Sequence, residues 1–165
     1  MKRKWMRLAL PVLLISAIAV GCGDDDGDTT GVTIDDLAGT WVANEASTGT
    51  KVELTLNAAP ATTIEIVTLG GTASLTITTS ERFTLVVDVP GLGGGTFTGS
   101  FTISGRNFTL TTDDDPDDPI TGTFTLSGNT LEVRASDVEI FDVIPPEGVG
   151  PEDAALLEAV FGRSS

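Results

Sequence analysis

The 165-residue chain contains no histidine and no tyrosine, and its single cysteine is Cys22. The absence of histidine excludes histidine general bases, Ser-His-Asp and Cys-His catalytic arrangements, and imidazole zinc sites. One cysteine alone cannot form an internal disulfide framework or a cysteine metal cluster. We therefore expect a protein that binds rather than an enzyme, with no cofactor.

Basic residues are also scarce, and they are concentrated at one end of the chain. Nine lysines and arginines stand against 24 acidic residues, and Lys2, Arg3, Lys4 and Arg7 are four of the nine. Residues 8–20 (LALPVLLISAIAV) then form an almost wholly apolar run. As a helix this run would span about 20 Å, short of a hydrocarbon core of about 30 Å. The pattern favours a signal peptide over a transmembrane helix.

The residues that end this run are Ala19-Val20-Gly21-Cys22, which resemble the lipobox of bacterial lipoprotein signals. The resemblance implies that residues 1–21 are removed, that Cys22 is lipidated and that the lipid attaches the protein to a membrane of the cell envelope. Because Gly23 rather than Asp follows Cys22, the same resemblance implies the outer membrane, on its periplasmic or surface face. The alternative is a plain secretory signal with a chance cysteine.

Removal of the signal peptide leaves 144 residues, a length typical of one domain. Five basic residues then stand against 24 acidic ones, a formal charge of −19. Such a charge opposes binding to nucleic acid and to anionic headgroups. Residues 22–31 hold the lipidated cysteine and a Gly-, Asp- and Thr-rich stretch that predicts a flexible acidic tether. Nothing in the sequence identifies a protein partner.

Apolar and polar residues alternate from Thr40 to about Val143, most often with threonine as the polar partner. This period of two predicts strands with one buried face. Residues 98–110 (TGSFTISGRNFTL) recur as 121–133 (TGTFTLSGNTLEV), and each copy predicts a hairpin. We predict an all-β fold over residues 32–145, an antiparallel up-and-down meander of 8–10 strands closed into a barrel. An open sandwich is the alternative.

Both ends of this region predict short helices. Residues 32–37 (VTIDDL) predict one helical turn capped by Thr33, with Asp36 in the capping-box position. Residues 146–165 predict a linker and a C-terminal helix, which begins at Pro151 and ends before Gly162. Because so short a helix is unstable alone in water, we expect it to dock on the barrel.

The segment Leu37-Ala38-Gly39-Thr40-Trp41 resembles the Gly-x-Trp start of lipocalins and lipocalin-like bacterial lipoproteins. The resemblance implies a calycin-type barrel in which Trp41 lies across the closed floor and an arginine from near the last strand packs on it. Arg134 is our candidate for that cation–π partner. Trp41 as an ordinary core residue is the alternative. The chain departs from the family in its short length and its lack of a disulfide.

An eight-stranded barrel is either filled by side chains or holds one small ligand. From the resemblance and the apolar pattern we expect a small apolar ligand inside. The alternative is a non-enzymatic interaction or structural module with a filled core. A cavity of about 300 Å³ or more would favour the ligand carrier. The tentative lining residues are Leu54, Leu56, Ile66, Leu75, Ile77, Phe83, Leu85, Phe101, Phe108 and Phe124.

The densest acidic run contains Asp113, Asp114, Asp115, Asp117 and Asp118. Five carboxylates in one loop are a weak candidate for a calcium site, since calcium takes six to eight oxygen ligands. A solvated loop that opposes aggregation is the alternative. No other metal site is expected.

Overall fold

The computed structural model describes residues 31–56, 62–91, 93–138 and 155–164. The predicted signal peptide, Cys22, most of the tether and the predicted linker lie outside these residues. No helix in the described ranges is long and apolar enough to cross a membrane.

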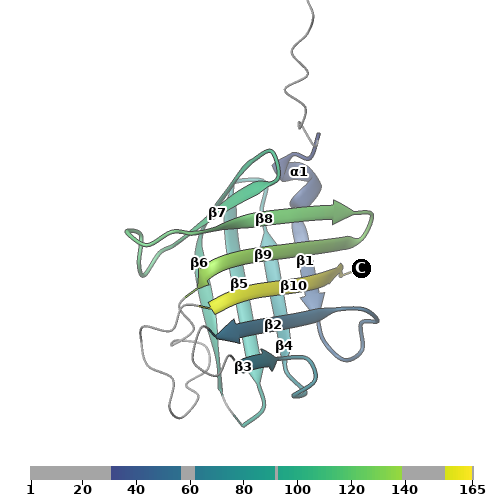
Figure 1. Ribbon diagram of the computed structural model, residues 1–165. Helices are drawn as coiled ribbons and strands as arrows, with labels where there is room; N and C mark the ends of the chain where they lie inside the picture. The colour runs from purple at the N-terminus through teal and green to yellow at the C-terminus, as the bar shows by residue number, and fades with distance from the viewer. Residues whose placement is uncertain (1–30, 57–61, 92, 139–154, 165) are drawn as a thin grey trace, which may run out of the picture.

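One helical turn and ten strands make up the described chain (Figure 1). All strand pairs are antiparallel. The elements are α1 (Ile34–Leu37), β1 (Gly39–Ala43), β2 (Lys51–Leu56), β3 (Thr62–Glu65), β4 (Thr72–Ile77), β5 (Arg82–Val89), β6 (Gly93–Ser104), β7 (Asn107–Thr112), β8 (Ile120–Ser127), β9 (Thr130–Val138) and β10 (Ala155–Arg163).

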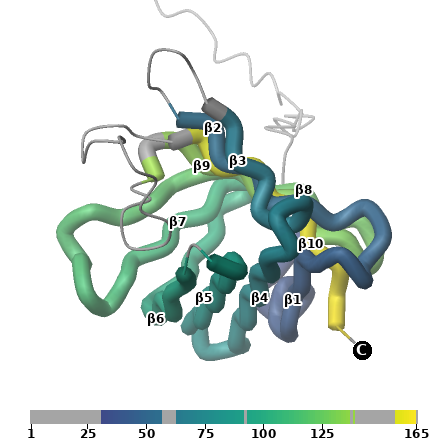
Figure 2. Tube along the Cα trace, turned by 90° about the horizontal axis from the view of Figure 1, so that it is seen from below, coloured from purple at the N-terminus to yellow at the C-terminus, as the bar shows by residue number. Residues whose placement is uncertain are grey.

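The ten strands form an eight-stranded barrel, because β1 and β2 together occupy one strand position and β3 and β4 together occupy the next. β1 and β2 follow each other along one edge of β10, with Trp41 opposite Arg163 and Lys51 opposite Val160. On their other side, β4 pairs with β1 and β3 pairs with β2. The remaining strands pair in sequence order up to β10, which returns to β1. The chain is therefore a closed eight-stranded antiparallel barrel, and Figure 2 shows its strands around a common interior. The predicted fold class is confirmed.

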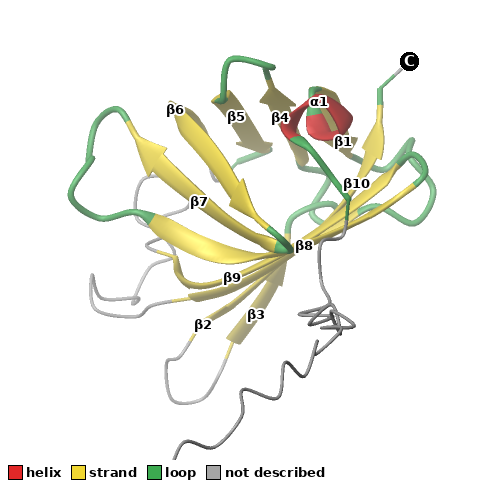
Figure 3. Ribbon diagram, turned by 90° about the horizontal axis from the view of Figure 1, so that it is seen from above, coloured by secondary structure: helices red, strands yellow, loops and turns green. Residues whose placement is uncertain are grey.

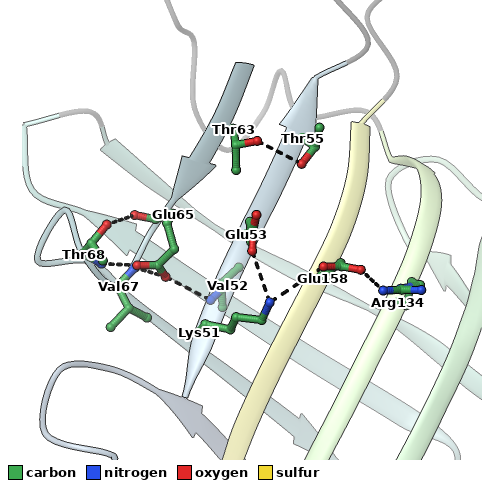
Figure 4. Close-up of polar contacts among 10 residues, drawn as sticks. All are labelled: Lys51, Val52, Glu53, Thr55, Thr63, Glu65, Val67, Thr68, Arg134 and Glu158. Atoms are coloured by element: carbon green, nitrogen blue, oxygen red, sulfur yellow. Dashed lines mark hydrogen bonds and ion pairs between the residues drawn. The ribbon is translucent and has the colours of Figure 1, made fainter. Parts of the chain in front are cut away.

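The side chain of Glu65 bridges the interruption between β3 and β4 (Figure 4). Its carboxylate accepts hydrogen bonds from the backbone N–H groups of Val52 at 3.3 Å, Val67 at 3.1 Å and Thr68 at 2.7 Å. Burial alone would raise the pKa of Glu65, but the hydrogen bonds with Thr68, Val52 and Val67 together hold it below its ordinary value. A carboxylate thus replaces the carbonyl groups that an unbroken strand would offer.

The interior is apolar, and no polar or charged residue of the described chain is fully buried. Two inward glycines make room for phenylalanine rings on the neighbouring strands. A Cβ on Gly122 would lie 2.6 Å from the ring of Phe108, and a Cβ on Gly99 would lie 2.7 Å from that of Phe83. These glycines occupy the same position in the two copies of the internal repeat. The same Cβ atoms would lie 2.2 Å from the Arg134 carbonyl and 2.0 Å from the Thr111 carbonyl, respectively. The Thr-Gly start of each copy therefore reflects the close approach of both a neighbouring backbone and an aromatic ring.

The predicted helical turn is confirmed as α1. The backbone N–H and the hydroxyl of Thr33 both donate to the Asp36 carboxylate at 2.8 Å. These bonds with Thr33 lower the pKa of Asp36. Leu37, the last residue of α1, is fully buried against the barrel interior.

The predicted C-terminal helix is wrong for Ala155–Arg163, which form the barrel strand β10. The barrel therefore extends past residue 145 to Arg163. Ala, Leu and Glu favour a helix locally, but as a strand this segment pairs with β9 on one edge and with β1 and β2 on the other. Leu157, Ala159 and Phe161 face the core, in alternation with outward residues. Hydrogen bonding along both edges outweighs the local preference.

The strand and the helix assign different roles to two adjacent residues, Val160 and Phe161. We expect Phe161→Ala to lower the free energy of unfolding by about 3–5 kcal/mol because its ring is buried in the core. The control Val160→Ala should cost about 1 kcal/mol or less, since Val160 faces outward. Urea denaturation followed by circular dichroism measures both. Equal losses would contradict the strand.

Glu65→Gln should lower the free energy of unfolding at pH 7 by about 1 kcal/mol, because a neutral amide accepts the backbone hydrogen bonds less strongly. Since the folded-state pKa of Glu65 is below the ordinary 4.5, its stabilisation is present above that pH and is lost as the pH falls through the folded value. Urea titrations at pH 7 and pH 3 should show the difference from wild type shrinking. The control Glu53→Gln should show little difference at either pH. A difference for Glu65→Gln that persists at pH 3 would refute this role.

Candidate functional site

One end of the barrel is closed by Trp41, which is fully buried. Its indole N–H donates to the carbonyl of Leu37 at 2.8 Å, so the ring is fixed against α1. The guanidinium of Arg163 lies over the ring, 4.3 Å from its centre. Arg163 also donates to the carbonyls of Ala38 at 3.1 Å and Asp36 at 2.5 Å. Trp41 and Arg163 thus form the closed floor of the barrel, which connects α1 and β1 to the last strand, β10.

The arginine over Trp41 is therefore Arg163, and the expected assignment of Arg134 is wrong. Arg134 lies on the outer face of β9, with 66% of its side chain exposed, and pairs with Glu158. The error follows from the helix expected over residues 151–161, which hid the true last strand. Once β10 is known to be a strand, an arginine near the last strand is Arg163.

Arg134 belongs to a charge network on the outer face of β2, β9 and β10 (Figure 4). The Nζ of Lys51 lies 3.1 Å from a Glu53 oxygen and 3.7 Å from a Glu158 oxygen. The hydrogen bond with Glu53, followed by the charge of Glu53 and Glu158, raises the pKa of Lys51. Glu65, Glu53 and Glu158 lie opposite one another on three adjacent strands. Because like charges in such positions repel, the two cations serve to stabilise the sheet.

Two open grooves lie on the same outer face, and Thr123 and Arg134 line both. Their volumes are about 480 and 460 Å³. Hydroxyl and charged side chains make up much of the wall of the first groove, whereas Phe108 and Leu156 also line the second. Both grooves are open to water on the outer face, so neither encloses an apolar ligand.

A smaller cavity of about 80 Å³ lies inside the barrel. It is bordered only by hydrophobic side chains, and none of Leu37, Trp41, Ile77 or Phe83 is among them. The cavity therefore lies beyond Trp41, in the part of the barrel away from α1. The lining residues are Val52, Leu54, Ile66, Ala73, Leu85, Val87, Val138, Leu157, Ala159 and Phe161.

Three of the ten expected lining residues, Leu54, Ile66 and Leu85, border this cavity. The other seven are buried in the core without bordering it: Leu56, Leu75, Ile77, Phe83, Phe101, Phe108 and Phe124. The alternation of the strands predicted which residues point inward, but not where space remains. The small inward residues Ala73 and Ala159 border that space, but Ala43 and Ala135 are also buried and do not, so small side chains alone do not locate the cavity from the sequence.

The acidic loop between β7 and β8 does not gather its carboxylates. Asp113 accepts hydrogen bonds from Arg82 Nη2 at 2.5 Å and from the Thr98 hydroxyl at 2.8 Å. The bond with Arg82, then that with Thr98, lowers the pKa of Asp113. No three acidic or other metal-ligating side chains in the described ranges are placed to hold a metal ion. The calcium candidate at Asp113, Asp114, Asp115, Asp117 and Asp118 therefore gains no support from the geometry.

The fold places the protein in the class of closed eight-stranded up-and-down barrels, and this architecture is consistent with a lipocalin-like fold. No protein-family model and no curated protein matches the chain.

The two arginines provide a matched test of the barrel floor. Arg163→Ala should lower the free energy of unfolding by about 2–4 kcal/mol, because it removes two charged hydrogen bonds and the contact with Trp41. Arg134→Ala should cost about 1 kcal/mol or less, since its ion pair is exposed. Trp41 is the sole tryptophan after residue 21, so its fluorescence during urea unfolding of the chain without residues 1–21 reports both variants. A larger effect from Arg134→Ala would reverse the assignment.

Proposed function

We propose that the chain is a lipid-anchored protein of the bacterial cell envelope whose lipocalin-like barrel binds a small apolar ligand and performs no catalysis. The internal cavity carries this proposal, because hydrophobic side chains alone border it. No polar or charged residue of the described chain is fully buried, and Asn44 Oδ1, a buried polar atom without a hydrogen-bond partner, does not border the cavity. A polar ligand would lose its hydrogen bonds with water there and gain none.

The cavity volume limits what enters. At about 80 Å³, it is roughly half the size of an engineered cavity of about 150 Å³ that binds benzene. The space fits the end of an aliphatic chain or a very small apolar molecule. Binding then depends on burial of apolar surface, at about 25 cal/mol per Å². With no polar group to orient the ligand, shape and length would determine selectivity.

The proposed anchor is lipid on Cys22, consisting of acyl chains such as palmitate. Its support is the lipobox-like segment that precedes Cys22. We place the anchored barrel at the outer membrane, on its periplasmic or surface face. The formal charge of −19 on the chain without its signal peptide would keep the barrel itself away from anionic headgroups.

A second candidate function is a non-enzymatic interaction or structural module with a filled barrel. The small cavity favours it, since pockets for drug-sized ligands measure about 300–1,000 Å³. The two candidates differ in one measurable property, which is whether the internal space takes up an apolar molecule.

Xenon and 1-octanol are suitable probes, because both are apolar enough for a dry cavity and small enough to enter in whole or in part. We expect both to shift the methyl NMR signals of Ala73 and Leu85 saturably in the wild-type protein. Ala73→Leu, in which the Leu85 methyl groups remain as reporters, should abolish the Leu85 shifts by filling the cavity. The control Val86→Leu should leave them unchanged, since Val86 lies on β5 with 41% of its surface exposed.

Native mass spectrometry of the protein purified from membranes adds a second readout. A mass that always equals the lipidated chain alone, together with no probe-induced shifts, would overturn the carrier and leave the filled module. Equal Leu85 shifts in wild type and Ala73→Leu would show that the probes bind elsewhere.

A further inference from the structure

We infer that the barrel stands with its Trp41 floor toward the membrane that holds Cys22 and with its cavity turned away. A ligand would then exchange with the aqueous compartment and not directly with the anchoring bilayer. The inference rests on the proposed lipid anchor. It is carried by the position of three features on the barrel: the attachment point of the tether, the acidic loop and the cavity.

The tether joins the barrel at the end closed by Trp41. The described chain begins at Gly31 and enters α1 three residues later, and Figure 3 shows α1 beside the strands β1 and β4. Gly31 lies nine positions after Cys22, with eight residues between them. Fully extended, this stretch reaches about 30 Å, and as a flexible coil about 15–18 Å. The lipid therefore lies within a short distance of α1.

The attachment point is held firmly to the barrel floor. Leu37 is fully buried, and Arg163 of β10 donates to backbone carbonyls on both sides of it, those of Asp36 and Ala38. Because α1 is fixed in this way, the described chain begins at the Trp41 end of the barrel. The short stretch back to Cys22 therefore makes this end the one nearest to the proposed lipid.

Electrostatic repulsion between the acidic loop and the membrane favours the same orientation of the barrel. Figures 1 and 3 show the loop between β7 and β8 projecting on the side of the barrel away from α1. Its residues 113–118 are exposed and carry five carboxylates, of which Asp113 pairs with Arg82. An anionic bilayer repels these carboxylates over a range of about 10 Å. Turning this side toward the membrane is therefore unfavourable.

The cavity occupies the half of the barrel that this orientation turns outward. Its lining includes Leu54, Val138 and Leu157, which lie near the ends of β2, β9 and β10 that are far from α1. Trp41 and the α1 end of the core separate the cavity from the tether. A route from the cavity to the anchoring bilayer through this end would have to pass the buried floor.

Single-cysteine labelling of the lipidated protein tests the orientation, because lipidation consumes the only native thiol. Thr79→Cys places a fluorophore in the β4–β5 turn, beside the start of β1, since Gly39 pairs with Ile77. Asp117→Cys places it in the acidic loop. Both residues are exposed. The protein is bound to phosphatidylcholine–phosphatidylglycerol vesicles that carry an energy-transfer acceptor on the headgroups. Each label is compared with the same variant carrying Cys22→Ser.

We expect several-fold more energy transfer from position 79 than from position 117, and none from the Cys22→Ser proteins. Equal transfer, or more from position 117, in vesicle-bound protein would overturn the orientation while leaving the anchor intact. Failure of the lipid-bearing protein to bind vesicles would instead overturn the anchor and the orientation together. Ligand uptake by the cavity is measured separately with xenon and remains distinguishable from both.

Discussion

Arg163 joins the last strand of the barrel to its first helical turn, and the closed structure depends on this contact. Its guanidinium lies over Trp41 and donates to the carbonyls of Asp36 and Ala38, residues more than 120 positions away in sequence. β10 carries Arg163 and supplies hydrogen-bonding edges to β9, β2 and β1. Without that strand in place, three strands would expose unpaired edges, and the apolar interior would open to water.

Much of the fold could be predicted because one buried face constrains each strand strongly. A slip of one residue would turn a strand's whole apolar set outward, so alternation carries both strand identity and register. Alternation does not identify the C-terminal segment as a strand. Ala155–Phe161 fits a helical pattern as well as a strand, and only pairing with β9, β1 and β2 decides between them. Arg134 lies near the last strand only if residues 155–163 form a helix, and this is why the sequence predicts the wrong arginine over Trp41.

The candidate site was predictable only in part. Alternation indicated inward residues, but a cavity depends on the volumes of side chains from distant strands, here Ala73 and Ala159 among larger neighbours. Charged and apolar side chains also lie on different faces of the barrel wall. Charges lie outside in networks such as Lys51 with Glu53 and Glu158, while no polar or charged residue of the described chain is fully buried. That separation is compatible with the proposed recognition of an apolar group by burial alone. The proposed tether would join the barrel at the Trp41 end, opposite the cavity.

Native-state hydrogen exchange at the end of β10 tests the central claim, a barrel closed by this strand and fastened at Trp41. The amide of Arg163 donates to the carbonyl of Asn129, and that of Ser164 donates to the carbonyl of Thr40, both at 2.8 Å. We expect both amides to exchange as slowly as the amide of Trp41, because they open only when the barrel does. Exchange as fast as that of the exposed loop at residues 113–118 would show a frayed end and contradict closure by β10.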